Sequence, residues 1–460
     1  SERCKRRRHY SLRIFPLRRS GVGTLSRTLV QVAPGSADNA LEIRYNASAG
    51  CFPMLKKIPV ARLKPGMFIH ELCGDWMSHP FWRTKFKLKG DDDLRRIVES
   101  GVRDVYIDTA RGLDDRDAVA ADVVQAAVEQ EIVAAMSAPE DHSIRVSVRD
   151  EMARARKVHE QAHRVVRSMM SDVRLGRAVS LEDAEPVVEA ISSSVLRNSS
   201  ALLGLIGIKN KDDYTFLHSV SVCTLMIAFG RSLGLVGEEL RQGGIGGLLH
   251  DIGKMKVPDE VLNKPGRLTD AEFDLIKKHP GDGHAVLLET PGIGAVPLDI
   301  TRHHHERLDG SGYPDRLAGD AISVMARMAA IVDVYDAITA DRCYHKGLPA
   351  AEALRKMWEW SAAHFDQKLL QGFMRCVGIY PVGSLVRLES GRLGVVTEQN
   401  ESNLLTPRLR VFFSTKSNAY LKPEMLDLGR KLGSGGGDRI LSAEAPDKWG
   451  VDPARFLLAE

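Results

Sequence analysis

The longest regular pattern of apolar and polar positions runs from about residue 180 to about residue 376 and is helical. Ser180-Leu181-Glu182-Asp183 resembles a capping box, in which side chains bind the free N–H groups at a helix start. Apolar residues then recur at the spacing of a helix face, at Val187, Val188, Ile191, Val195 and Leu196. Similar spacing continues to about Cys376, so we predict an almost wholly helical domain.

The segment before this domain mixes strand and helix patterns. Residues 58–72, IPVARLKPGMFIHEL, alternate in strand fashion around a Pro65-Gly66 turn. A helical pattern covers Asp91–Ser100, and VRDVYID, residues 102–108, follows as a strand. The pattern predicts a small α+β module, followed by further helix. The module also has an aromatic and histidine cluster that forms either core packing or a ligand surface: Trp76, His79, Phe81 and Trp82.

The segment after the helical domain returns to alternation. Residues 383–399 and 409–414 have the β-branched content of short antiparallel strands, with a turn at Ser390-Gly391. From Gly433 to Gly437 the chain is glycine-rich, which predicts a flexible end. The predicted fold class is therefore mainly α, with a small α+β N-terminal module and a short β-rich C-terminal extension.

These changes of pattern divide the chain into six segments. They are a leader (1–53), the N-terminal module (54–140), a helical linker (141–179), the helical domain (180–377), the β-rich extension (378–432) and a flexible tail (433–460). The leader has no periodicity, so we expect Met54 to be the natural start and the residues before it to be translated upstream sequence. An Arg-rich targeting peptide is the alternative. Ser137–Ser143 is the expected linker between module and helices.

Composition narrows the function classes. The net charge of +4 is misleading, because residues 1–53 carry +7 and the remaining chain carries −3, which argues against binding a nucleic-acid polymer. No apolar run reaches the ~18 residues of a membrane span, so we expect no membrane insertion. The six cysteines are scattered without C-x-x-C spacing, which fits free thiols in a reducing cytoplasm.

Histidine and aspartate cluster at separated places in the helical domain. They are His218, His250, Asp251, His279, the triplet His303-His304-His305, and Asp333. His250 and Asp251 end the apolar run IGGLLHDIGK, and Asp333 also lies among apolar residues, where an unpaired carboxylate is costly. Bound cations would explain both; buried His–Asp pairs without metal are the alternative.

This mixture of ligands indicates the metal and the chemistry. Imidazole with carboxylate and no thiolate suits Fe or Mn best, with Ni and Zn as alternatives. Two such ions about 3.5–4 Å apart form a hydrolase site for a phosphoryl group. Lys254 follows His250 by one turn and would neutralise a phosphate oxygen, unless it is an ordinary solvated lysine.

The segment ERLDGSGYPDRLAGD, residues 306–320, predicts a shaped loop because it is rich in Gly and Pro. Gly310 and Gly312 would let a ligand approach the backbone closely. Tyr313 offers a face for stacking and a polar tip.

HDIGK (250–254), HHERLDGSGYP (304–314) and DVYDAITADR (333–342), with PDEVLNKPGRLT (258–269) and IKKHP (276–280), resemble the HD-GYP family of cyclic di-GMP phosphodiesterases. The resemblance covers about residues 180–376 and implies an HD-type helical catalytic domain. Residues 54–108 resemble the small N-terminal module of some members. The metal ligands that it implies are His218, His250, Asp251, His279, His304, His305 and Asp333, with Asp251 bridging.

The resemblance also assigns substrate contacts. Lys254 matches a lysine that contacts phosphate, and Tyr313 and Arg342 match positions that hold guanine or phosphate, beside Gly312 in the loop. Departures from the family pattern affect substrate affinity and the number of metals. Tyr214 stands where some members have a third-metal glutamate, so two metals are expected. The other departures are Cys343, His345 and Arg316, with Lys346 as a potential substitute for His345; the extra His303 is expected outside the ligand set.

The implied function is metal-dependent hydrolysis of cyclic di-GMP to pGpG, with a second cut giving GMP, in bacterial signalling. Two alternatives stay open. One is another HD-type phosphohydrolase acting on nucleoside phosphates, and the other is a non-catalytic cyclic di-GMP sensor. A homodimer, or signalling partners of the N-terminal module, also stay open.

Overall fold

The computed structural model describes residues 55–73, 85–115, 117–135, 146–206, 214–264, 266, 268–340, 347–400, 403–430 and 437–457. Several sequence predictions lie outside these residues: the leader 1–53 with the Met54 start, Trp76, His79, Phe81, Trp82, Ser137–Ser143, Arg342, Cys343, His345 and Lys346. The side chain of Tyr214 is also outside the description.

The N-terminal module is a five-stranded antiparallel sheet with one helix. Its elements are β1 (Leu55–Pro59), β2 (Phe68–Leu72), β3 (Phe86–Lys87), α1 (Asp91–Glu99), β4 (Asp104–Asp108) and β5 (Val119–Ala120), in the sheet order β3-β2-β4-β1-β5. The predicted alternation forms its core, since Ile58, Ile69, Val105 and Ile107 are fully buried. The strands, turn and helix predicted between residues 58 and 108 are confirmed, except that η1 (Val60–Arg62) is a 3-10 helix within the segment predicted as strand.

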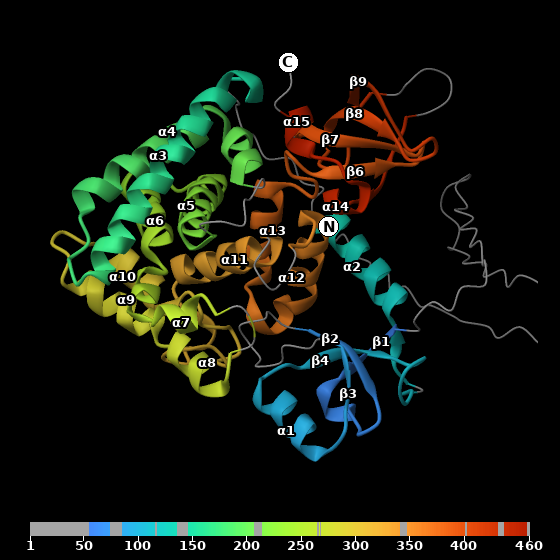
Figure 1. The fold of residues 1–460 in the computed structure, drawn as a ribbon, viewed down its shortest axis with the longest axis horizontal. Coiled ribbons are helices and arrows are strands. Elements are labelled where there is room, and N and C mark those ends of the chain that lie inside the picture. The colour runs from blue at the N-terminus through green and yellow to red at the C-terminus, as the bar shows by residue number, and fades with distance from the viewer. Residues whose placement is uncertain are drawn as a thin grey trace, which may run out of the picture. The chain divides into compact units, whose positions relative to one another are not determined.

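A helical domain follows, in which helices pack on helices without an intervening sheet (Figure 1). The long helices are α2 (Ala121–Ala135), α3 (Val148–Arg174), α4 (Leu181–Ile206), α5 (Tyr214–Ser232), α6 (Gly237–Leu249), α9 (His279–Leu288), α10 (Ala295–His303), α11 (Val324–Thr339), α12 (Ala350–His364) and α13 (Gln367–Val377). The short helical segments are η3 (Ile252–Lys256), α7 (Asp259–Leu262), α8 (Asp270–Ile276) and η4 (Gly319–Ala321).

Two of these helices, α5 and α11, are central to the domain. Residues 218–229 of α5 and 328–333 of α11 are all buried, and the two helices pack against each other. Helices without a polar face belong in the interior of a helical domain. Both carry predicted ligands, so these ligands lie in the buried interior of the domain. No helix in the described part of the chain combines the length and hydropathy needed to cross a bilayer.

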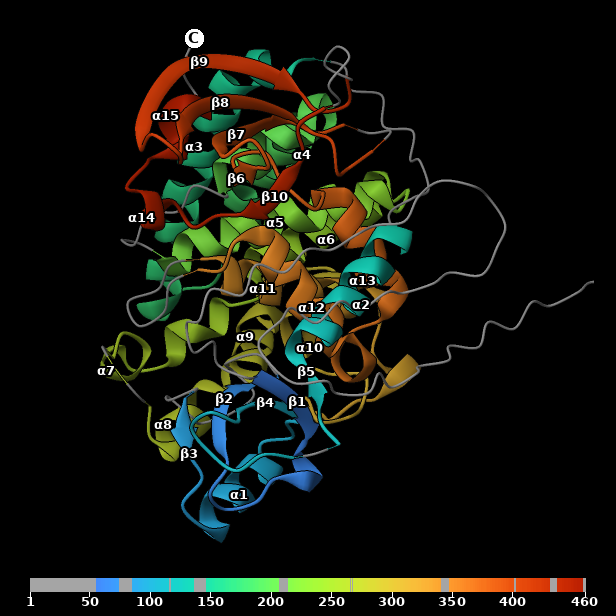
Figure 2. The same ribbon diagram turned by 90° about the vertical axis from the view of Figure 1, so that its right-hand side faces the viewer.

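The C-terminal part is a second five-stranded antiparallel sheet, with the order β10-β6-β7-β8-β9 (Figure 2). Its elements are β6 (Leu385–Leu388), β7 (Arg392–Glu398), β8 (Arg408–Ser414), β9 (Ala419–Asp427), β10 (Ile440–Ala443), α14 (Pro446–Trp449) and α15 (Pro453–Leu457). The predicted fold class, mainly α with two β-containing ends, is confirmed.

The flexible tail predicted from residue 433 is wrong for residues 437–457. β10 pairs with β6 along one edge of the sheet, and α15 packs on β7 and β8. The rings of Phe412 and Phe456 stack with their centroids 3.8 Å apart. The glycine run hid this, because the strand and helices after it are too short for a periodic signal and are stabilised only by packing on the sheet.

Candidate metal centre

The structure brings all seven predicted ligands together from five places in the helical domain. His218 lies on α5 and Asp333 on α11; His250 and Asp251 follow the end of α6; His279 begins α9; His304 and His305 follow α10. They form two groups, each with ligand atoms within 4.8 Å of one another. One group contains Asp251, His279, His304 and His305, and the other contains His218, His250 and Asp333.

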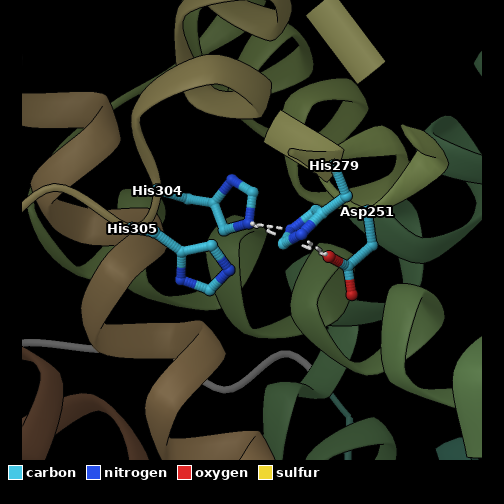
Figure 3. Close-up of side chains that lie close together, drawn as sticks. All are labelled: Asp251, His279, His304 and His305. Carbon is cyan, nitrogen blue, oxygen red and sulfur yellow. Dashed lines mark hydrogen bonds and ion pairs between the residues drawn. The ribbon is translucent and has the colours of Figure 1, made fainter. Parts of the chain in front are cut away.

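The first group is shown in Figure 3, where the histidine rings and the carboxylate converge. The Nε2 atom of His279 lies 3.2 Å from Oδ1 of Asp251 and 3.3 Å from Nε2 of His304. The ring of His305 lies beside both imidazoles, with centroids 4.1 Å from His304 and 5.0 Å from His279. Four donor atoms therefore surround one point.

The second group has the same character. Nε2 of His218 lies 2.9 Å from Oδ1 of Asp333 and 3.2 Å from Nε2 of His250. Asp251 connects this group to the first, since its Oδ2 lies 3.3 Å from Nε2 of His250 and 3.4 Å from Nε2 of His218. One carboxylate thus directs one oxygen at each group, which is the arrangement of a bridging ligand.

Hydrogen bonds at the outer ring nitrogens fix the tautomers of three of these histidines. Nδ1 of His250 lies 2.8 Å from the carbonyl oxygen of Gly247, and Nδ1 of His279 lies 2.8 Å from that of Ile276. Nδ1 of His304 lies 3.0 Å from the carbonyl oxygen of Thr301. A carbonyl oxygen only accepts, so each Nδ1 carries a hydrogen, and Nε2 is the ring atom that points inward and offers its lone pair to a metal when the ring is neutral.

Burial and the neighbouring charges shift the pKa values of the histidines in opposite directions. Burial acts to lower the pKa of His250, but the carboxylates of Asp251 and Asp333 raise it to about 10. Burial and the neighbouring His250 and His279 lower the pKa of His304 to about 3, and burial lowers that of His305 well below its usual value. The neutral rings are therefore available as metal ligands at neutral pH.

The arrangement fits divalent metal ions. His279 and His304 direct Nε2 atoms at each other across 3.3 Å, which leaves facing lone pairs unless a cation or proton lies near them. The buried Oδ1 of Asp251 and Nε2 of His305 have no hydrogen-bond partner. Buried polar atoms are normally satisfied, so these orphaned atoms indicate a site for cations.

Lys254 contacts the same centre, as predicted, but it does not lie on a continuation of the helix that precedes His250. α6 ends at Leu249 and the chain continues as η3, in which Lys254 Nζ contacts Asp251 Oδ2. η3 lies against α9 because Gly253 has no side chain: a Cβ there would lie 2.0 Å from the carbonyl oxygen of His279. Burial acts to raise the pKa of Asp251, but His250 and Lys254 hold it well below its usual value.

The predicted loop lies beside the first group. The ring of Tyr313 stacks on His305, with centroids 4.8 Å apart and planes 30° apart. The structure shows a reason for glycine at position 312 that differs from the predicted approach of a ligand. A Cβ there would lie 2.5 Å from Arg307 N and from Glu306 Cα, so the glycine lets the loop fold onto its own backbone.

Comparison with known proteins agrees with this geometry. A family model described as HD domain matches residues 207–369, and one described as Domain of unknown function (DUF3391) matches residues 55–184. The chain is 49% identical over 398 residues to Cyclic di-GMP phosphodiesterase PA4108 of Pseudomonas aeruginosa, covering 86% of this chain and 94% of the relative. The chain belongs to the HD-GYP family of cyclic di-GMP phosphodiesterases.

Other relatives match a smaller part of the chain. The HD-GYP chain is 38% identical over 164 residues to the response regulator RpfG of Xanthomonas campestris, a cyclic di-GMP phosphodiesterase, covering 35% of this chain and 42% of the relative. It is 36% identical over 178 residues to 3′3′-cGAMP-specific phosphodiesterase 1 of Vibrio cholerae, covering 38% of this chain and 41% of the relative. These two relatives are named for different cyclic dinucleotides, cyclic di-GMP and 3′3′-cGAMP.

Two buried carboxylates of this HD-GYP protein were missed by sequence reasoning. Asp336 places Oδ2 2.7 Å from Nδ1 of His218, so it orients that ring from behind. Its signal was the three-residue spacing from Asp333, which puts both on one face of α11. Glu306 accepts the backbone N–H groups of Asp315 at 2.7 Å and Leu317 at 3.0 Å, which holds the end of the loop.

The other predicted positions are His303, Arg316 and the substrate contacts. His303 lies outside both groups, as expected; its Nδ1 is 2.7 Å from Asp299 and its Nε2 is 3.0 Å from Asp315. Arg316, which replaces a glycine common in HD-GYP proteins, adopts the left-handed region with a φ of 56°. The roles predicted for Lys254, Tyr313, Gly312 and Arg342 stay predictions.

Proposed function

We propose that this HD-GYP protein hydrolyses cyclic di-GMP to linear pGpG, with a second cut giving GMP, and thereby lowers the level of this second messenger. The observation that carries the proposal is the pair of His/Asp groups joined by Asp251, with the Tyr313 loop beside them. The relative that is 49% identical over most of this chain is named for the same activity.

The cofactors that we propose are two divalent transition metal ions, one in each group, with Asp251 as the bridging ligand. Fe or Mn suits imidazole and carboxylate ligands best, and Ni and Zn are alternatives; neither group contains a thiolate. When bound, such ions lower the pKa of water and neutralise charge on a phosphoryl group.

The chain's own residues position the substrate. Lys254 lies beside Asp251 at the rim of the second group and would donate to a nonbridging phosphate oxygen. Tyr313 is held by His305 and would stack on guanine, as aromatic rings do on bases. In the reaction, water supplies hydroxide to phosphorus, the bond to the ribose 3′-oxygen breaks, and that oxygen receives the proton.

We also propose a cytoplasmic location for the protein. Cytoplasmic location is favoured by the free, buried thiols of Cys73 and Cys223, which are typical of a reducing compartment. Burial raises the pKa of the Cys223 thiol, which makes it unreactive.

The deciding experiment compares products from cyclic di-GMP, 3′3′-cGAMP and dGTP with the Mn- or Fe-loaded protein. We expect pGpG from cyclic di-GMP and little turnover of dGTP. Asp251→Ala should reduce the rate by at least about 10³-fold, because the shared carboxylate serves both groups. Asp274→Ala, an exposed position on α8, is the matched control.

Each alternative has its own outcome. Equal, very slow hydrolysis by wild type and Asp251→Ala, with cyclic di-GMP still bound, would make the protein a sensor. Preference for dGTP would make it another HD-type phosphohydrolase, and preference for 3′3′-cGAMP would change the substrate while leaving the metal centre as proposed.

A further inference from the structure

The N-terminal module contacts the loop that carries Tyr313. Arg103, just before β4, places Nη2 2.9 Å from Oδ2 of Asp309, inside the loop. The side chain of Asp309 is 11% exposed and that of Arg103 is 61% exposed, so the carboxylate is the buried partner. Next to this pair, Gly101 lies against Ser311, with 3.8 Å between an ideal Cβ on the glycine and Cβ of the serine.

Asp309 also determines the shape of the loop. Its Oδ1 accepts the backbone N–H of Ser311 at 2.9 Å and the hydroxyl of the same residue at 2.5 Å. Partial burial acts to raise the pKa of Asp309, but Ser311, His364 and Arg103 lower it, so the group is an anion. Tyr313 follows Ser311 by two residues. We therefore expect a displacement of Asp309 to displace the stacking ring of Tyr313 as well.

A second route from the module to the loop runs through α12. Tyr106 of β4 donates to Glu359 at 3.0 Å, and Glu71 of β2 pairs with Lys356. The last turn of α12 then binds the loop backbone. The N–H of Asp309 donates to the carbonyl oxygen of Ala363 at 3.2 Å.

A third contact of the module reaches α8. Arg96 of α1 lies 3.2 Å from Asp270 at the start of α8. Just after α8, Lys277 holds its Nζ 5.7 Å from the centroid of Tyr313. The module thus contacts the loop itself, the helix α12 that binds the loop backbone, and the helix α8 that leads to Lys277.

We propose that the N-terminal module is a positioning element for the substrate loop and that Arg103 is its principal positioning residue. The inference rests on the proposed function of the loop and extends it to a module that the family model describes without a function. A ligand or partner that pulls the module away would weaken substrate binding and leave the metal centre intact, because none of the seven metal-group residues lies in the module.

Kinetics of Arg103 variants in the full chain, with cyclic di-GMP as substrate, test the proposal. An exposed ion pair is weak, so we expect Arg103→Ala to raise KM only about twofold to fivefold. Arg103→Glu would set a second carboxylate against that of Asp309. It should raise KM by at least about fivefold, with kcat and metal content unchanged. Arg103→Lys keeps the positive charge, so its KM should stay close to that of the wild type. Arg95→Glu is the matched control, because Arg95 pairs with Asp92 on its own helix.

Hydrogen exchange of residues 307–318 provides a readout that needs no turnover. Arg103→Glu should speed exchange there, while Arg95→Glu should not. Unchanged KM and unchanged exchange would overturn the inference, as would a fall in kcat accompanied by metal loss. Faster exchange in a protein whose wild type does not cleave cyclic di-GMP would support the contact and refute the proposed function instead.

Discussion

His218 shows how single residues make this site. Its Nε2 faces Asp333 and its Nδ1 faces Asp336, so one ring is held from both ends by carboxylates of the same helix. A carboxylate behind a histidine fixes the ring orientation and raises its basicity toward a metal. Both residues that hold the ring are buried, which leaves little freedom for it to rotate. We therefore expect Asp336 to act through His218 and to touch no substrate.

Asp336→Asn tests this role. The amide keeps the size of the side chain but loses the charge, so metal affinity of the second group should fall about 10-fold to 100-fold. Metal titration followed by elemental analysis measures the affinity, and Asp336→Glu should restore part of it. Unaltered metal affinity in a folded Asp336→Asn protein would show that the carboxylate has only a packing role.

At the scale of elements, the site depends on how closely segments approach. η3 lies against α9, and this contact sets the distance between Asp251 at the start of one and His279 at the start of the other. Gly253 is the point of contact, where backbone meets backbone. A side chain at this position would push apart the two elements that supply the first group.

Gly253→Ala should therefore both destabilise the protein and lower metal affinity. A Cβ 2.0 Å from the carbonyl oxygen of His279 forces the backbone to shift, at a cost of about 1–3 kcal/mol or more. Thermal unfolding and metal titration measure the two effects. Gly281→Ala is the matched control on α9, since nothing lies within 4 Å of its Cβ position. Equal behaviour of the two variants would contradict the close approach.

At the scale of the whole molecule, binding of metal links the folds of five separate segments. Each group draws on residues far apart in the chain, from His218 to Asp333, that meet only in the folded state. Ligands that bind only the folded state stabilise it by mass action. Stability should thus depend on the free metal concentration.

Removal of metal by a chelator should lower Tm, and Mn²⁺ or Fe²⁺ should restore it. The stabilisation is about 2.7 kcal/mol when free metal is 100 times Kd. Differential scanning calorimetry of wild type measures the change, with Asp251→Ala as the control that should not respond. A wild-type Tm that is indifferent to both chelator and metal would refute the metal centre.

The sequence by itself determined the helical domain, the two β-containing ends and the seven residues of the metal groups. Helical and strand periods are local signals, and the motifs around His250, His304 and Asp333 are contiguous, so both could be recognised without coordinates. The same signals wrongly predicted a flexible tail at residues 437–457, because the short strand and helices there depend on contacts with the sheet.

Only the tertiary structure decided how these residues act together. It alone separated the ligands into two groups, gave the distances from each oxygen of the predicted bridging residue Asp251 to those groups, and revealed Asp336 behind His218. It also showed Arg103 on the loop of Tyr313, more than two hundred residues away in sequence. Distances between remote segments depend on side-chain packing across the whole fold, and no local pattern encodes that information.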